Sequence, residues 1–271
     1  MASGLVILVL GLTLCCARGQ VPAPVTPPGP PPIAAGTIKV NPKDGAEMVY
    51  IPAGDFQMGD SDIADNPRHA VTVTGYWIYK DLVTVAQYRN YCHLTKHKFP
   101  PAPPWGWRDD NPIVNVTWVD ASAYAEWARA TLPTEAQFEK AARGTDGRKY
   151  PWGDQFDSSQ LWCSATNPGG LSTTAVGRYA VSPFGATDMV GNVWEWCADW
   201  YDKNFWTSSV ARGIDPRNDS AGTQQERVRR GGSFLNVTDA GLFRSSLRLS
   251  RNPNYIVEDD GFRCVAAFTP N

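Results

Sequence analysis

The second half of the chain constrains the fold most strongly, because after about residue 145 it shows no sustained helical or strand periodicity. This half is rich in Gly, Pro, Asn and Trp, with only short strand candidates. The whole chain has 11 Trp among 271 residues, and tryptophan at that density either fills the core of a loop-rich fold or lines a ligand surface. Both interpretations stay open. The pattern predicts a domain with little regular secondary structure.

The first half predicts three helices. Thr84 is a candidate N-cap for a helix that runs to about His93. Asp120 is expected to cap a second helix, whose apolar residues recur at helical spacing. Residues 134–137 (TEAQ) form a capping box, and Gly144 is expected to end the third helix.

Short strands are expected before these helices. Residues 49–54 form a strand candidate that ends in a Pro/Gly turn, and residues 56–59 resume it. Residues 69–73 alternate like a half-buried strand. Together with the three helices, these strands predict an α+β fold class.

The N-terminal residues are predicted to be a targeting segment and a tether. Residues 5–12 are an apolar run too short to span a bilayer, so residues 1–19 are interpreted as a signal peptide. Residues 20–36 are proline-rich and are expected to form an extended linker before a domain at 37–271. We therefore expect a secreted, periplasmic or extracellular protein with no transmembrane segment in the mature chain. A lipid anchor at Cys15 is the disfavoured alternative, because the preceding leucine fits a lipoprotein signal poorly.

The charge balance argues against nucleic acid as a partner. The formal net charge is -2, whereas nucleic-acid-binding proteins usually carry a clustered basic surplus. The basic run at residues 227–230 is short and is interpreted as an ordinary solvated or ion-paired stretch.

Four cysteines remain once a signal peptide is removed, and they form no CxxC pair, so a thiolate zinc site is not expected. They are Cys92, Cys163, Cys197 and Cys264. Three disulfide pairings are possible for four cysteines, and free buried thiols are an equal alternative.

Six short blocks follow one another along the globular part. They are IPAG and MG at 51–59, LPTEAQFEKAARG at 132–144, YPWGD at 150–154, DMVGNVWEW at 188–196, RRGGSF at 229–234 and GFRC at 261–264. In this order they closely resemble the family of formylglycine-generating enzymes, also called sulfatase-modifying factors. The resemblance extends from about residue 47 to about residue 268. The resemblance implies that family's compact α+β fold, which is related to C-type lectins and has little regular structure.

The resemblance also implies an oxidase chemistry whose metal ligands are missing here. Family enzymes oxidise a cysteine of a sulfatase peptide to formylglycine, using molecular oxygen and copper held by two cysteines, and soft thiolates suit Cu(I). The matching positions in this chain are Asn236 and Gly241, and no cysteine occurs between Cys197 and Cys264. Copper is therefore not expected, and no catalytic residue is assigned.

A structural calcium site is implied by the resemblance at the DMVGNVWEW block. Its ligands would be the carboxylates of Asp188 and Glu195 and the carbonyls of Gly191 and Val193, all hard oxygen donors that suit Ca²⁺. The alternative is that the two carboxylates only cap the turn. The family's other calcium position falls near residues 164–177, where acidic residues are absent, so that site is expected to be lost.

The family's substrate groove is implied around Ser233, which would form its floor. Trp105, Trp107 and Arg248 are candidates for its border, and core or loop packing is the alternative for the tryptophans. His93 and His97 lie four residues apart, which is half of a metal-site pattern if their helix persists. Ordinary surface or capping roles are favoured for them, and His69 is interpreted as structural.

Three hypotheses for function follow from the lost cysteines. The first is an exported non-oxidase module that binds a peptide, protein or glycan ligand in the old groove. The second is a modifying enzyme of altered chemistry that acts on a peptide or small molecule. The third is a secreted scaffold or a modulator of an active paralogue.

Overall fold

The computed structural model describes Met1 and residues 33–167, 171–236 and 240–268. The compact unit is Ile33–Asn271. The predicted signal peptide, Cys15 and nearly all of the predicted linker lie outside the described residues. No helix in the described part of the chain has the length and apolar character needed to cross a membrane.

The described residues contain the three expected α-helices, each opened by a threonine capping box. They are α1 (Val85–Thr95), α2 (Trp118–Trp127) and α3 (Glu135–Arg143). Thr84 caps α1 and Gly144 ends α3, as predicted. The prediction that Asp120 caps α2 is wrong. The cap is Thr117, and Asp120 is the third helical residue, whose carboxylate accepts a hydrogen bond from the Thr117 backbone N–H at 3.0 Å.

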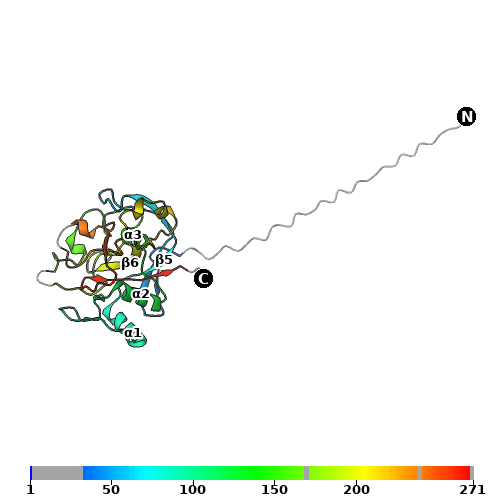
Figure 1. Ribbon diagram of the computed structural model, residues 1–271. Helices are drawn as coiled ribbons and strands as arrows, with labels where there is room; N and C mark the ends of the chain where they lie inside the picture. Colours follow the sequence, from blue (N-terminus) through cyan, green and yellow to red (C-terminus); the bar gives the residue numbers. More distant parts are fainter. Residues whose placement is uncertain (2–32, 168–170, 237–239, 269–271) are drawn as a thin grey trace. The chain divides into compact units, whose positions relative to one another are not determined.

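The strands form three small sheets (Figure 1). The first is antiparallel, in the order β1 (Ile38–Val40), β2 (Glu47–Ile51), β5 (Tyr76–Tyr79), β10 (Val265–Ala267). The second pairs β3 (Gly54–Met58) with β4 (His69–Val73). The third has the order β8 (Leu249–Arg251), β7 (Arg227–Arg230), β6 (Trp194–Trp200), β9 (Asp260–Gly261), with β9 parallel to β6. Short 3₁₀ turns lie at Ser158–Gln160, Phe205–Thr207, Val210–Arg212 and Ala240–Phe243.

The strands predicted at 49–54, 56–59 and 69–73 correspond to β2, β3 and β4. The sequence did not predict β5 and β6, and burial explains why. Every residue of β5 is buried, and so are five of the seven residues of β6, so neither strand shows the polar alternation of a half-exposed strand. The α+β prediction is confirmed by this mixed arrangement.

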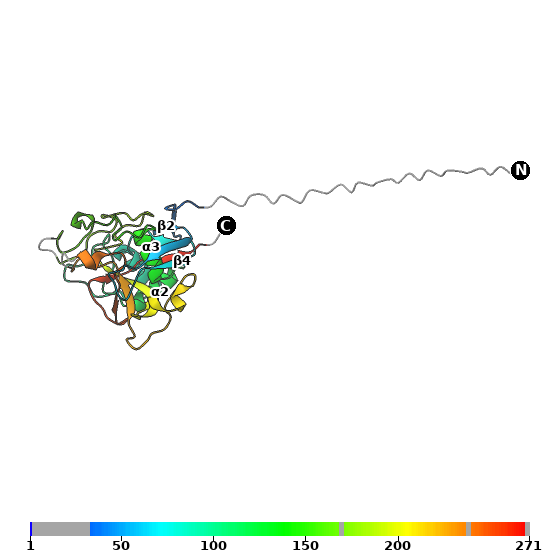
Figure 2. The same cartoon turned by 90° about the horizontal axis from the view of Figure 1, so that it is seen from above.

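Helix α3 lies at the centre of the unit and packs against β3, β4, β6 and β7 (Figures 1 and 2). All of its residues except Gln137 are buried, including four charged ones. Three of these charged residues join two buried arginines in an ion-pair network that we define as Glu135, Glu139, Arg143, Arg230 and Arg248. Such a network is tolerated inside a protein only because each charge faces an opposite charge at hydrogen-bond distance.

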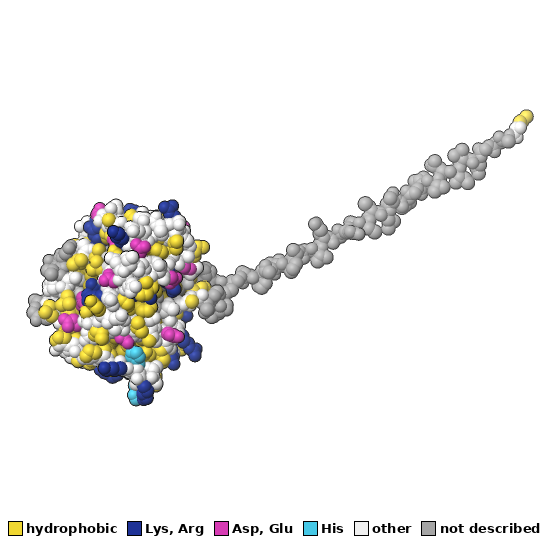
Figure 3. Space-filling view, in the orientation of Figure 1, with side chains coloured by type: hydrophobic (Ala, Val, Ile, Leu, Met, Phe, Trp, Pro, Cys, Tyr) yellow, Lys and Arg dark blue, Asp and Glu magenta, His cyan; other side chains and the backbone are white. Residues whose placement is uncertain are grey.

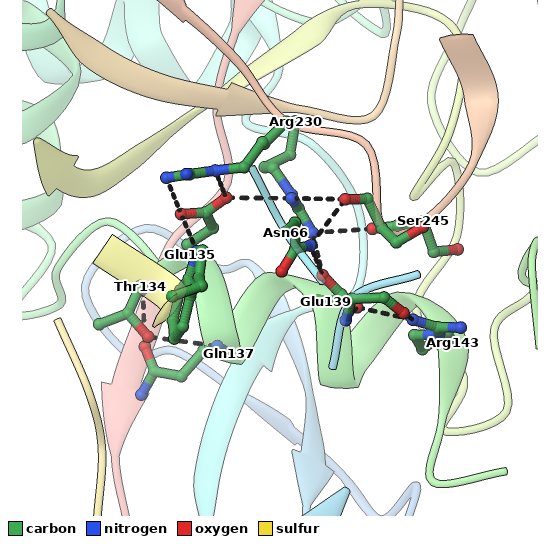
Figure 4. Close-up of polar contacts among 12 residues, drawn as sticks. Asn66, Thr134, Glu135, Gln137, Glu139, Arg143, Arg230 and Ser245 are labelled. Carbon is green, nitrogen blue, oxygen red and sulfur yellow. Dashed lines mark hydrogen bonds and ion pairs between the residues drawn. The ribbon is translucent and has the colours of Figure 1, made fainter. Parts of the chain in front are cut away.

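Figure 4 shows how the ion-pair network joins α3 to β7. Arg230 on β7 lies 3.0 Å from the Glu135 carboxylate and also contacts that of Glu139. Glu139 accepts further hydrogen bonds from Arg143 at 2.7 Å and from Asn66 at 3.0 Å. In the basic run at 227–230, Arg229 and Arg230 are therefore ion-paired, whereas Arg227 lies over the rings of Trp118 and Trp200.

The tryptophans differ in burial. Trp77, Trp194, Trp196 and Trp206 are buried, whereas Trp105 and Trp107 are only half-buried. All four cysteines from Cys92 onward are buried free thiols. Of the two alternatives left open for them, the structure supports free thiols.

Candidate functional site

A glycine turn follows β7 and determines where Ser233 lies. Gly231 and Gly232 have φ values of 96° and 78°, in the left-handed region that favours glycine. A Cβ atom on Gly232 would lie 2.7 Å from the ring of Phe243, so a larger residue does not fit there. The turn brings Ser233 into a fully buried position beside Asn236. We call residues 231–236 the glycine–serine turn.

Asn236 holds this turn together through its side chain. Its carboxamide oxygen accepts hydrogen bonds from the Ser233 backbone N–H at 2.7 Å and from the Ser233 hydroxyl at 3.3 Å. The Asn236 backbone N–H donates to the Ser233 carbonyl at 3.0 Å. The Ser164 hydroxyl donates to the Asn236 carbonyl at 2.8 Å. Asn236 therefore has a defined structural role, and Gly241 lies in the 3₁₀ turn Ala240–Phe243 that follows.

Two aspartates and two arginines lie next to the turn. The Ser233 hydroxyl donates to the Asp259 carboxylate at 3.1 Å. Asp260 pairs with Arg229 at 2.8 Å and with Arg251 at 3.1 Å. Burial, and then the negative charge of Asp259, raise the pKa of Asp260 to about 6, and the nearby guanidinium of Arg229 opposes this rise. The cluster thus carries a carboxyl group that titrates close to neutral pH.

Of the predicted groove residues, the structure brings Trp105 close to the turn. Its ring meets that of Phe234 edge to face at 5.3 Å, and Phe234 follows Ser233 directly. Trp107 instead packs edge to face on Phe99 at 5.3 Å. Arg248 is 2% exposed and belongs to the ion-pair network, with its guanidinium 2.7 Å from Glu135. Arg248 therefore contacts Glu135, whereas the side-chain partners of Ser233 are Asn236 and Asp259.

Three of the predicted calcium ligands, Asp188, Gly191 and Val193, lie in a tight turn before β6, and Glu195 is the second residue of that strand. Asp188 has a φ of 51° and Gly191 of 83°, so the backbone turns sharply there. The Asp188 carboxylate accepts hydrogen bonds from the backbone N–H of Gly177 at 2.6 Å and of Tyr179 at 3.2 Å. Val193, between Gly191 and the start of β6, is fully buried.

Arg263 supplies a positive charge at this turn. It donates to the two carboxylate oxygens of Glu195 at 2.7 and 2.9 Å. Burial raises the pKa of Asp188 and of Glu195, and the charge of Arg263 opposes both shifts. A calcium ion would have to share Glu195 with Arg263. Among the residues that the structure describes, no three His, Cys, Asp or Glu side chains gather closely enough to hold a metal ion. Calcium at this turn stays a prediction.

The histidines are separated by the end of α1. The helix ends at Thr95, and Lys96 adopts a left-handed conformation after it, so His93 and His97 do not share one helical face. His97 pairs with Asp120, and His69 contacts the Pro67 carbonyl at 2.6 Å and packs on Trp206.

Sequence reasoning missed two features of this site. The first is the cluster of Asp259 and Asp260 with Arg229 and Arg251, whose only signal was an acidic pair directly before the GFRC block. The second is Cys163, which precedes Ser164 and so lies near the glycine–serine turn. No sequence signal predicts this approach, because 69 residues separate Ser164 from Ser233 along the chain.

Residues 34–268 match the family described as the sulfatase-modifying factor enzyme 1-like domain. The chain belongs to this family. The formylglycine-generating enzyme of Streptomyces coelicolor is 30% identical over 307 aligned residues, which cover 90% of this chain and 94% of the relative.

Solved structures agree with the family and its fold. PvdO from Pseudomonas aeruginosa superposes with a TM-score of 0.75 and 25% identity, over 86% of this chain and 99% of that one. Variable protein 1 of Treponema denticola has a TM-score of 0.69 at 22% identity, over 85% of this chain and 98% of that one, and supports the fold alone.

Proposed function

We propose that this family member is an exported non-oxidase module that binds a peptide, protein or glycan ligand on the surface around the glycine–serine turn. The observation that carries the proposal is the role of Asn236. Where the family resemblance places the first copper-binding cysteine, a carboxamide holds the Ser233 backbone.

The potential metal ligands near the turn support the proposed absence of a two-sulfur copper site. An amide oxygen is a hard ligand and does not replace a thiolate for Cu(I). Cys163 offers one sulfur at most, and it is buried in an apolar cluster with Tyr150, Leu161 and Phe243. Burial raises the pKa of Cys197 and of Cys264 well above the usual value, so these thiols stay protonated at neutral pH.

The surface itself offers groups suited to binding. Trp105 is half-buried against Phe234 and keeps part of its indole accessible for stacking. Arg251 keeps 22% of its side chain exposed beside the buried carboxylates of Asp259 and Asp260. An indole face next to a charged group fits a polar ligand with an apolar surface, such as a peptide or a glycan.

One observation favours a second candidate, a modifying enzyme of altered chemistry. A carboxyl group with a pKa of about 6, like that of Asp260, is poised for proton transfer near neutral pH. It lies one residue from Asp259, which contacts Ser233. Formation of a product from a peptide or small molecule, and its loss in Asp260→Asn, would favour the modifying enzyme over the binding module.

We further propose that the chain carries one structural calcium ion at Asp188 and Glu195. Asp188 lies in the tight turn directly before β6 and Glu195 lies near the start of that strand, and carboxylates are typical calcium ligands. Atomic emission on the purified protein tests this, with one calcium per chain expected. Calcium below a tenth of an equivalent after dialysis against calcium-containing buffer would contradict it.

The binding proposal is tested by probing the full exported chain against a glycan array and a random-peptide display library. We expect Trp105→Leu to abolish the signal of any bound probe, because it removes the accessible indole beside Phe234. Trp127→Leu is the matched control, since it removes an indole that packs on Tyr124 instead. Retained binding by Trp105→Leu would rule out this surface.

A further inference from the structure

A second concave site lies where α1 ends and α2 begins. The cavity has a volume of about 230 Å³. Residues from three segments line it: Tyr88 and His97 around α1, Asn115 and Asp120 around the start of α2, and Ile256 in the loop after β8. No residue of the glycine–serine turn lines it. Figure 3 shows histidine side chains on the part of the surface that carries α1.

One wall of this cavity is a fixed pair of polar side chains. His97 Nε2 lies 3.0 Å from one carboxylate oxygen of Asp120. The other oxygen of Asp120 accepts hydrogen bonds from the Thr117 backbone N–H at 3.0 Å and hydroxyl at 2.6 Å. The α2 capping box therefore holds Asp120, and Asp120 in turn orients the imidazole of His97.

The pair leaves polar atoms available to a ligand. When Nε2–H donates to Asp120, the second ring nitrogen of His97 becomes a hydrogen-bond acceptor. Both side chains keep about a third of their surface exposed, 31% for His97 and 29% for Asp120. Asn115 completes this polar side, with its side-chain N–H donating to the Pro101 carbonyl at 3.0 Å.

Most of the other lining side chains are apolar. Phe99 and two prolines line the cavity together with Val116 and the exposed Ile256. The Phe99 ring is held by Trp107 at 5.3 Å and by Tyr88 at 6.2 Å. A cavity lined by both an aromatic ring and hydrogen-bonding side chains suits a ring with one apolar face and a polar edge.

The charged side chains that line the cavity favour an uncharged ligand over a cation or an anion. Asp120 contributes one negative charge, and Lys98, which also lines the cavity, contributes one positive charge. A cationic ligand would meet Lys98, and Arg89 already lies over the Phe99 ring at 5.5 Å. An anionic ligand would meet the Asp120 carboxylate. A polyol carries no charge and provides hydroxyl groups that donate to Asp120 and to His97.

We propose that this cavity binds a single neutral sugar ring, with its apolar C–H face on Phe99 and its hydroxyl groups on His97 and Asp120. The volume is below the range typical of sites for drug-sized ligands, roughly 300–1,000 Å³, and suits one monosaccharide unit. This site is separate from the one proposed above, because no residue of the glycine–serine turn lines the cavity.

Saturation-transfer NMR on the full chain with methyl pyranosides tests the proposal. The probes are the methyl glycosides of glucose, galactose, mannose and N-acetylglucosamine, each at about 10 mM, a concentration at which a millimolar Kd gives high occupancy. We expect at least one to bind with its ring C–H protons facing the protein. His97→Leu should weaken that binding at least tenfold. His93→Leu, at an exposed position near the end of α1, should leave it unchanged.

Two results would overturn the proposal. The first is that none of the four glycosides gives saturation transfer, and the second is that binding survives His97→Leu. Trp105→Leu serves as a further comparison, since it alters the surface at the glycine–serine turn. If only Trp105→Leu abolishes sugar binding, the sugar site belongs to the glycine–serine turn and the cavity is excluded.

Discussion

Replacing Arg263 with methionine should be one of the most destabilising changes in the protein. Arg263 is fully buried and donates to both oxygens of Glu195. It also donates to the backbone carbonyls of Lys80 and Thr187, each at 2.9 Å. Methionine fills much of the same volume but makes none of these bonds. In the calcium-free protein, the variant therefore leaves the buried carboxylate of Glu195 without a cation.

The magnitude follows from what is left unpaired. Breaking a buried ion pair by removing one partner costs about 3–5 kcal/mol. A typical domain has only about 5–15 kcal/mol of stability, so Arg263→Met should leave a marginally folded protein. Neutralising Glu195 as well should recover part of this loss, because burying a neutral amide costs less free energy than burying an unpaired carboxylate. The double variant Glu195→Gln with Arg263→Met should regain about 2 kcal/mol or more of the loss.

Urea unfolding followed by tryptophan fluorescence measures these differences, provided that the slope of the free energy against urea is unchanged. At lower pH the loss in Arg263→Met should shrink. Burial already raises the pKa of Glu195, and without Arg263 this carboxyl takes up a proton more readily in the folded state. A loss below about 1 kcal/mol, or a double variant no more stable than Arg263→Met, would refute this account of the pair.

Three further predictions concern the glycine–serine turn and its surroundings. Asn236→Ala should lower the free energy of unfolding by about 1–2 kcal/mol, because the Ser233 N–H loses its acceptor, and an unchanged urea midpoint would contradict the role of the carboxamide. Gly232→Ala should cost about 2 kcal/mol or more in the same assay, since its Cβ meets the Phe243 ring at 2.7 Å, and a cost near zero would show that the ring moves aside. The pKa of Asp260 is raised from 3.8 to about 6, so the folded state holds this proton more tightly. The group's contribution to stability, about 3 kcal/mol well below pH 3.8, falls by about 2 kcal/mol between pH 4 and pH 6 and is lost above the folded-state pKa. Asp260→Asn should remove that part of the pH dependence of stability, and an identical pH profile in both proteins would contradict the shift.

Local signals in the sequence predicted the helices well, because each begins with a threonine and an acceptor three residues later. The error at Asp120 came from the same signal. Thr117 and Asp120 both suit a cap, and only the reciprocal bond between them decides which residue is the cap and which is the third helical residue. Strand β6 was missed for a different reason. Its residues are buried on both faces, so its sequence lacks the alternation by which strands are recognised.

The sequence allowed only part of the candidate site to be predicted. The family resemblance assigned Ser233 and Trp105 to the groove, and the structure places Trp105 against the residue after Ser233. Arg248 was assigned to the groove, and in the structure it pairs with Glu135. The sequence could not show this pairing, because the two residues are 113 positions apart and leave no local pattern. The approach of Ser164 to Asn236 depends on tertiary packing in the same way.

The copper content of the protein tests the central claim, the absence of the family's oxidase chemistry, most directly. The full chain, exported to an oxidising compartment, is assayed for copper per chain and for oxygen consumption with a cysteine-containing sulfatase peptide. The double variant Asn236→Cys with Gly241→Cys is assayed beside it. We predict no stoichiometric copper and no formylglycine product for the natural chain, and copper binding only in the double variant. One equivalent of copper with peptide oxidation in the natural chain would contradict the account.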